Sequence, residues 1–449
     1  MISPSTDLSF LKKYKIIFLI GFSPKYAYLP GSEMLKRASR IWTNEQGDKI
    51  GIWKEDWGNQ LGFKFKEYYP DIDYEVWRPD IRADGIYEHI FENGVKNKSF
   101  PVKYKLFSQG FRYFKDYYSP EIEQTIESYC KKHQNIVLLI PFSRKLITSR
   151  LLKKFSDKAP ILCTHFLNAE KLLCKVKFCS NPIRFLQNSF KTIQRQRHIS
   201  CIENLLLVHK KYIPELEKKY NLKVYFNTFG ADLSFWKPDK TKKESRLKYN
   251  ISVDKLVILV SSRLQPNYQI EKVLNLVTKL KSYNVLFIFT SHGPPSYEKK
   301  LKQMIEENNL HNYVQFTGYV NEEVLKDLYI ACDYFFMSSL YNAGPMSTFI
   351  AMLMGKPVIS TDSGLAAEIL KEKRCGLIIP TCNYNYWEKI FRNILEGKQQ
   401  IKLIDYSFVS HLFNWQSIII KWHTIINTVI QQSEKRKMAV KNKLNHPKV

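Results

Sequence analysis

The stretch YNAGPMSTFIAMLMGKPVIST (residues 341–361) sets the order of structural elements that the rest of the chain repeats. A small-residue turn leads into Ser347 and Thr348, an apolar run follows, and Gly355 to Pro357 separates that run from Val358 to Thr361. This order predicts a loop, a buried helix, a break and a buried strand. Helix N-termini after such loops favour anions, because free N–H groups and the helix dipole point there. The stretch therefore also indicates a phosphate site, although no charged side chain stands in its turn.

Similar apolar runs recur on both sides of this stretch, separated by amphipathic segments. Continuous apolar runs of strand length are typical of parallel strands covered by helices on both faces. Two such sets predict two α/β domains. Ligands of open α/β sheets lie at the carboxyl ends of the strands, so the default site is a cleft between the two sheets. The expected strands are 15–21, 135–142, 159–166, 204–208, 223–230, 255–263, 284–293, 313–320, 334–339, 357–361 and 376–380.

A composition change near Trp236 predicts the domain boundary. Phe235-Trp236-Lys237-Pro238 is followed there by the polar run DKTKKESR. Residues 403–433 have an apolar stripe at helical spacing and predict a helix. Residues 50–115 are rich in Tyr, Trp and Lys, and their periodicity assigns no element. The expected parts are an N-terminal acceptor-side Rossmann-like domain (1–236), a C-terminal nucleotide-sugar-binding domain (237–410), a helix returning to the first domain (411–433) and a basic tail (434–449).

Composition indicates a globular chain with anionic partners. Hydrophobic residues make up 44% and aromatic residues 14% of the 449 residues, which excludes a disordered chain. The formal net charge of +27 favours nucleic acid, phospholipid or phosphorylated small molecules. Abundant Lys, Asn and Ile are equally expected from AT-rich coding. No RRM, KH, zinc or helix-turn-helix signature accompanies the basic residues, so a specific nucleic-acid partner is not predicted.

Cysteine usage and the N-terminus predict a reducing, cytoplasmic compartment. The eight cysteines form no CxxC pair and no zinc-like spacing with histidines, so no metal site is predicted. Several, such as Cys163 and Cys332, stand in apolar contexts where a free thiol behaves as a small hydrophobe. The apolar run Ile16 to Phe22 is too short to span a bilayer and lacks a cleavage site, so it is interpreted as the first buried strand.

Motifs of the second half follow one another in the order of a known enzyme family. They are VILVSSRL (257–264), FIFTSHGPPSYEKKLKQMI (287–305), HNYVQFTGYVNEEVLKDLYIACDYFFMSS (311–339), the opening stretch through SGLAAEIL (363–370), CGLIIP (375–380) and FNWQSIIIKWHTII (413–426). The chain resembles the retaining GT-B glycosyltransferases of the GT4 type (glycosyltransferase group 1), which transfer a sugar from a nucleotide diphosphate. The resemblance implies the GT-B fold, with two doubly wound Rossmann-like domains facing a cleft. It is thinner in the first half, at PGSEMLKRA (30–38) and FNTFGADLSFWKP (226–238).

The resemblance implies a site that needs no metal and no cofactor, with a UDP-, GDP- or ADP-sugar as co-substrate. The protein then supplies the positive field for the leaving diphosphate. Arg263 is the implied phosphate ligand, and a surface ion pair is the alternative. Main-chain N–H groups of the 342–348 turn would complete the grip, and an ordinary turn is the alternative. The implied donor-binding residues are Gly31, Arg263, Tyr268, Lys272, Tyr319, Ala343, Gly344, Met346, Ser347, Thr348 and Glu368, and the implied catalytic residues are His165, Arg263 and Asn342.

Three side chains at or near the site that the resemblance implies, those of His165, Glu33 and Glu368, each have two interpretations. His165 follows an expected strand, and it either approaches the donor sugar or is a structural histidine. Gly31 would bring the backbone close to the diphosphate, while Glu33 beside it holds the loop or contacts the acceptor. Glu368 contacts ribose or acceptor, or it is a charge near a helix N-terminus.

The sequence also departs from the family pattern at three positions. Asn342 and Ile350 stand where the family has two glutamates, and Tyr268 stands where it has a lysine. Losing a phosphate lysine and a ribose carboxylate each removes on the order of 1–3 kcal/mol of charge-assisted hydrogen bonding. Lys272 and His292 are the candidates for compensation. An active divergent transferase, an enzyme with an unusual donor and a noncatalytic partner all remain open.

A basic segment, residues 171–219, interleaves lysines and arginines with apolar side chains. Such a segment suits an anionic bilayer, and equally a solvated helix face above a core stripe. The first functional hypothesis is a retaining hexosyltransferase of lipopolysaccharide, capsule or other surface glycan synthesis, acting on a glycan or lipid-linked acceptor at the inner face of the plasma membrane. The second is a catalytically silent GT-B partner of another transferase. The third, charge-driven nucleic-acid binding, has the least support.

Overall fold

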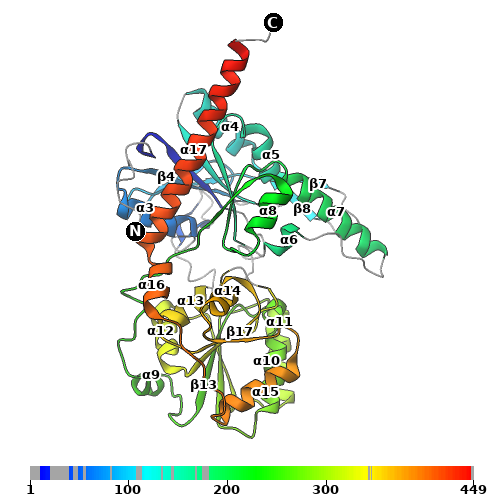
Figure 1. Cartoon of the computed structure of the whole chain (residues 1–449), viewed down its shortest axis with the longest axis vertical. Coiled ribbons are helices and arrows are strands. Elements are labelled where there is room, and N and C mark those ends of the chain that lie inside the picture. Colours follow the sequence, from blue (N-terminus) through cyan, green and yellow to red (C-terminus); the bar gives the residue numbers. More distant parts are fainter. Residues whose placement is uncertain are drawn as a thin grey trace. The chain divides into compact units, whose positions relative to one another are not determined.

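The computed structural model contains two compact α/β units (Figure 1). Described residues up to 227 and from 418 onward form unit 1, and residues 228–417 form unit 2. The described residues are 11–20, 40–43, 49–53, 57–80, 83–107, 114–132, 135–142, 146–166, 169–173, 182–341, 344 and 346–445.

Unit 1 is built on an eight-stranded sheet in the order β12-β11-β10-β9-β1-β4-β6-β5. All neighbouring strands pair in parallel except β5, which runs antiparallel to β6. The strands are β1 Lys15–Leu19, β4 Asp73–Pro79, β5 Tyr87–Ile90, β6 Lys96–Phe100, β9 Ile136–Pro141, β10 Ile161–His165, β11 Asn204–Leu207 and β12 Lys223–Phe226, with separate hairpins β2 Arg40–Thr43/β3 Lys49–Trp53 and β7 Lys103–Phe107/β8 Phe114–Tyr118.

Helices and apolar side chains cover this sheet. Ile17 on β1, Leu138 on β9 and Leu205 on β11 are fully buried in one core cluster with residues of the covering helices, such as Ile126 and Leu151. The unit 1 helices are α3 Trp57–Tyr68, α4 Pro120–Lys131, α5 Leu146–Phe155, α6 Glu170–Leu173, α7 Pro182–Ile199 and α8 Ile213–Tyr220, preceded by the short η1 Leu11–Lys13.

Unit 2 contains a six-stranded sheet in the order β15-β14-β13-β16-β17-β18, and every pair is parallel. The chain runs outward from β13 to β15, then returns and starts again beside β13 with β16. The strands are β13 Leu256–Ser261, β14 Val285–Thr290, β15 Val314–Gly318, β16 Tyr334–Met337, β17 Val358–Thr361 and β18 Leu377–Ile379, and the helices are α9 Lys242–Lys248, η2 Pro266–Tyr268, α10 Ile270–Lys279, α11 Pro295–Glu307, α12 Glu322–Ala331, α13 Met346–Leu353, α14 Gly364–Glu372, α15 Tyr384–Leu395 and α16 Tyr406–Phe413.

These two sheets confirm the predicted fold class of two doubly wound α/β domains. Each buried strand expected from an apolar run lies inside its expected range. Within the described residues, no helix has both the length and the apolar character needed to cross a membrane.

The C-terminal segment differs from its prediction. The expected helix over 403–433 is two helices, α16 and α17 (Trp415–Asn445), separated at Asn414. Residues 434–445, within the expected basic tail, continue α17 as helix. Side-chain contacts with unit 1 account for this order: Glu434 accepts a hydrogen bond from Tyr14, and Arg436 pairs with Glu203.

Candidate functional site

The strand order of unit 2 creates a switch point between β13 and β16. If the strands of unit 2 are numbered 1 to 6 in chain order, their order across the sheet is 3-2-1-4-5-6. The connections after the two central strands, β13 and β16, therefore leave in opposite directions. Helices α10, α11 and α15 share one core cluster on one face, and α12 lies on the other (Figure 1). Parallel sheets of this order bind ligands in the crevice outside the carboxyl ends of the strands at the switch point. This edge is therefore the candidate site.

Arg263 lies two residues after β13, next to the switch point. Its side chain is exposed, while its neighbour Leu264 is buried and anchors the backbone to the end of β14. The N–H of Leu264 donates a hydrogen bond of 3.2 Å to the carbonyl of His292. The guanidinium is thus carried by a fixed backbone at the edge where an anion would bind.

Gln269 fastens the segment after Arg263 to two other strand ends. Its backbone is left-handed (φ 55°) and its side chain is buried. The amide Nε2 donates to the carbonyls of Ser338 at 2.7 Å and Thr381 at 3.0 Å, and Oε1 accepts from the Tyr384 hydroxyl at 2.9 Å. Sequence reasoning missed Gln269, since its role depends on contacts with residues distant in sequence. This single side chain holds the ends of β16 and β18 against the start of α10.

Two further bonds join the segment after β13 to the residues after β16. Ser338 Oγ donates to the Tyr268 carbonyl at 2.6 Å, and the Leu340 N–H donates to the Asn267 carbonyl at 2.8 Å. Tyr268, which stands where the resembling family has a lysine, therefore helps to fix the carboxyl edge of the sheet through its backbone carbonyl. Lys272 lies on the first turn of α10, exposed, with its ammonium 5.0 Å from the ring centre of Tyr384.

The turn from β16 into α13 forms the other side of the switch point. The first-turn N–H groups of α13, at Met346, Ser347 and Thr348, have no intrahelical acceptor by helix geometry. The Tyr329 hydroxyl donates to the Ser347 carbonyl at 2.7 Å and orients this turn. A Cβ on Gly344 would meet its nearest neighbour, Phe349, at 3.4 Å, so this position is not tightly packed.

His292 lies at the end of β14 in an unusual backbone. The preceding Ser291 has φ 85°, a left-handed conformation that a side chain disfavours. His292 Nδ1 lies 3.0 Å from Glu298 Oε1, which also accepts the Gly293 N–H at 2.6 Å. Gly318, with φ 69°, leaves room for the imidazole. The end of β14 is thus shaped by local constraints that the sequence pattern does not reveal.

The predicted site residues separate into three groups. Those on unit 2 follow carboxyl strand ends of one sheet: Arg263, Tyr268, Lys272, Tyr319, Gly344, Met346, Ser347, Thr348 and Glu368. His165 is the last residue of β10 in unit 1, is 7% exposed, and packs its ring 5.9 Å from that of Phe142. Gly31, Glu33, Asn342 and Ala343 lie outside the described residues.

Gly293 gives a direct test of how tightly this edge is packed. A Cβ there would stand 1.9 Å from the carbonyl oxygen of Leu264, beside Arg263. We expect Gly293→Ala to displace that backbone, to cost about 1–3 kcal/mol of unfolding free energy and to weaken ligand binding at the edge. Chemical denaturation measures the first effect. The control is Gly85→Ala, where a Cβ meets nothing within 4 Å and stability should stay within about 0.5 kcal/mol. Equal stability of both variants would contradict the packing argument.

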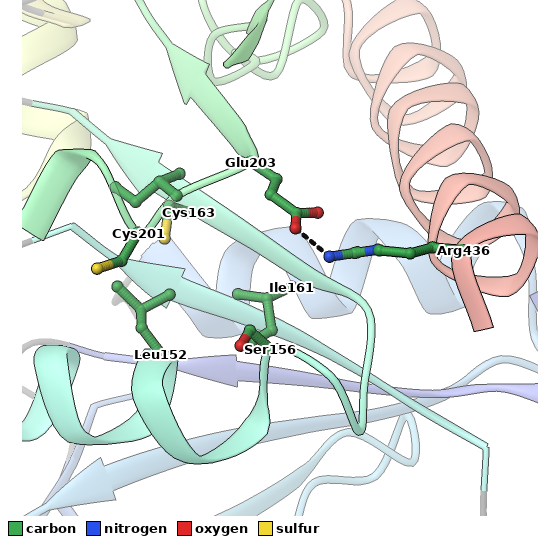
Figure 2. Close-up of a pocket in the computed structure, with 8 residues that line it drawn as sticks. Leu152, Ser156, Ile161, Cys163, Cys201, Glu203 and Arg436 are labelled. Atoms are coloured by element: carbon green, nitrogen blue, oxygen red, sulfur yellow. Dashed lines mark hydrogen bonds and ion pairs between the residues drawn. The ribbon is translucent and has the colours of Figure 1, made fainter. Parts of the chain in front are cut away.

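A small pocket in unit 1 is not the candidate site. It lies at the amino ends of β10 and β11, the edge opposite to the one where open α/β sheets bind ligands. Figure 2 shows the ion pair of Glu203 and Arg436 at one side of it. Its lining residues are Leu152, Ser156, Ile161, Cys163, Cys201, Ile202, Glu203 and Arg436.

The described part of the chain contains no group of three or more His, Cys, Asp or Glu side chains that could hold a metal ion. At the unit 2 edge, Arg263 and Lys272 carry positive charge, and the first turn of α13 presents main-chain N–H groups.

Comparison with known proteins points to one enzyme class. Residues 241–407 match the family model described as glycosyl transferases group 1. A probable sucrose-phosphate synthase of Thermosipho melanesiensis is 27% identical over 216 residues, which are 46% of this chain and 48% of that protein. A putative colanic acid biosynthesis glycosyltransferase, WcaL of Escherichia coli, is 23% identical over 164 residues, 35% of this chain and 38% of that one. These matches span about half or less of the curated relatives.

Solved structures agree with the whole fold. A sucrose-phosphate synthase from Thermosynechococcus elongatus has a TM-score of 0.63 at 16% identity, covering 93% of this chain and 100% of that one. HepE from Anabaena, solved in complex with UDP, has a TM-score of 0.62 at 15% identity, covering 92% and 100%. At such identities the likeness establishes the fold of the chain.

Proposed function

We propose that this chain is a retaining glycosyltransferase that uses a nucleotide-diphosphate sugar. The chain has the GT-B fold, and its residues 241–407 match glycosyl transferases group 1. One observation carries the proposal. The switch point of the unit 2 sheet brings Arg263 and the first turn of α13 to the same edge. A guanidinium and uncharged N–H groups together suit a pyrophosphate, whose charge grows as the glycosidic bond breaks.

The chemistry needs no nucleophile from the protein. An acceptor hydroxyl attacks the anomeric carbon from the face that the diphosphate leaves, so the configuration is retained. The leaving phosphate takes the hydroxyl proton. The protein's own task is to bind the diphosphate through Arg263 and the N–H groups of Met346, Ser347 and Thr348, and to orient the sugar. Asn342, Ala343 and Glu368 belong to the same proposed site, which works without metal or cofactor.

The proposed acceptor is a surface glycan or its lipid-linked precursor. Support comes from relatives: WcaL is named for colanic acid biosynthesis, and a further structure with the same fold, at 13% identity and a TM-score of 0.55, is WaaG, a glycosyltransferase of lipopolysaccharide biosynthesis. The formal charge of +27 suits an enzyme working at an anionic inner membrane surface. Cytoplasmic placement and peripheral membrane association are part of this proposal.

A second function, a silent partner that binds nucleotide without turnover, is favoured by Ile350. This residue lies on α13 at the family's ribose-binding glutamate position, is 8% exposed and cannot accept a hydrogen bond from ribose. The described part of that helix supplies no carboxylate in its place.

One experiment separates the two functions. Thermal-shift measurements on the full chain with UDP-, GDP- and ADP-sugars should show stabilisation by one nucleotide class, because a ligand that binds only the folded state raises its stability. Release of free nucleoside diphosphate in the presence of cell-envelope glycan supports the transferase. Saturable binding without release supports the silent partner. Absence of any shift at millimolar concentrations contradicts both.

A further inference from the structure

The carboxyl edge of the unit 1 sheet carries cations from two separate elements. Lys210 follows the end of β11, and its ammonium lies 4.8 Å from the ring centre of Phe226, the last residue of β12. Asn227 Nδ2 donates to the Ile418 carbonyl at 3.2 Å, which fixes the beginning of α17 at the end of β12. Lys421 lies one turn further along α17 and is partly buried. The chain thus brings Lys210 and Lys421 to one edge.

The two ammonium groups repel one another. Burial and, after it, the charge of Lys210 lower the pKa of Lys421 below its ordinary value. Among the residues that the structure describes, no carboxylate forms an ion pair with either lysine. Two other lysines of unit 1 with little exposed surface, Lys15 and Lys98, are arranged differently, because each contacts two carboxylates. Lys421 thus holds a partly buried ammonium close to the exposed cation of Lys210, which is costly, and a bound anion would relieve it.

We propose that Lys210 and Lys421 bind a phosphate group at the carboxyl edge of unit 1. Lysine binds phosphate as a compact point charge, and two lysines match its double charge near neutral pH. The same edge carries two buried histidines, His165 at the end of β10 and His209 just after β11. The ligand is a phosphorylated acceptor, either a soluble sugar phosphate or a lipid phosphate. That the bound phosphate belongs to an acceptor rests on the proposed function, whereas the phosphate site itself does not.

Titration calorimetry of the full chain with inorganic phosphate tests the site. We expect Lys210→Gln and Lys421→Gln each to weaken binding about tenfold, and the double variant to bind no phosphate saturably. Lys211→Gln is the matched control. It removes the same charge one residue away, from an exposed lysine whose ammonium lies over its neighbour Tyr212, and should leave affinity unchanged. Lys421→Gln should unfold at the same or higher temperature than the parent without phosphate, because it removes the repulsion.

The Arg263→Ala variant separates this site from the proposed donor site. Phosphate binding that survives Arg263→Ala but is lost in the lysine double variant supports the proposal, even if no nucleotide binds. Loss in Arg263→Ala alone, or equal affinity of the double variant and Lys211→Gln, overturns it.

Two further arms identify the source of the phosphate. Competition by glucose 6-phosphate, sensitive to the double variant, assigns the site to soluble sugar phosphates. Cosedimentation with phosphatidic acid vesicles but not with phosphatidylcholine vesicles, again sensitive to the double variant, assigns it to lipid phosphates. If the double variant keeps both the competition by glucose 6-phosphate and the cosedimentation with phosphatidic acid vesicles, the proposed site is contradicted.

Discussion

Replacing Arg263 with alanine is expected to weaken binding of nucleoside diphosphates by about 10- to 150-fold. A charge-assisted, two-pronged contact with phosphate contributes about 1.5–3 kcal/mol, and each 1.4 kcal/mol is a factor of ten. The protein should stay folded, because the Arg263 side chain is exposed and substitutions of exposed side chains usually change the free energy of unfolding little.

Titration calorimetry with UDP, GDP and ADP measures this effect, and chemical denaturation verifies the fold. Lys302→Ala, which removes an equal charge from an exposed position on α11, is the control and should bind like the parent. Unchanged affinity in Arg263→Ala would falsify the donor site at the β13–β16 switch point.

Replacing Arg246 with alanine is expected to cost about 3–5 kcal/mol of unfolding free energy, the largest stability effect that we predict. Arg246 is 3% exposed and donates to the carbonyls of Ala331 at 3.0 Å, Val253 at 2.7 Å and Lys255 at 3.0 Å. It also pairs with Asp333 at 2.6 Å. Removing the guanidinium takes a shared donor away from these buried and part-buried acceptors around the start of β13.

The control for Arg246 is its neighbour on the same carboxylate. Lys242 pairs with Asp333 at 2.8 Å, but its side chain is 53% exposed. Lys242→Ala should therefore change stability by less than about 1 kcal/mol, since exposed ion pairs contribute little. Urea denaturation of both variants gives the comparison. A similar loss in the two would show that burial of the Arg246 network is not the source of its contribution.

The strands most visible in the sequence are those whose buried residues are apolar. Residues 50–115 stayed unassigned, although they contain β4 and β6 of the main sheet. The reason is chemical: Glu75 on β4 is 1% exposed and Lys98 on β6 is 8% exposed, and their charged ends lie 3.7 Å apart. The Trp77 Nε1–H also donates to Glu75 at 2.7 Å. A strand that buries a paired charge lacks the continuous apolar run by which buried strands are recognised.

The candidate site was predictable only in part for a related reason. The positions of Arg263 and of the α13 N-terminus follow from a strand that ends and a helix that begins, and both boundaries leave a sequence pattern. Gln269 and Ser291 leave none, since their left-handed backbones and tertiary contacts depend on the assembled sheet. The roles assigned to Arg263, His165 and Glu368 remain predictions for the experiments above.

The bonds of Gln269 have a consequence for engineering of this protein. One amide group couples the beginning of α10 to Tyr384, on a helix whose remaining residues extend away from the edge. Substitutions at Tyr384 or in the preceding loop can therefore alter ligand preference without touching any ligand. A search for variants with altered binding at the proposed donor site should include these supporting positions along with the residues proposed to contact the donor.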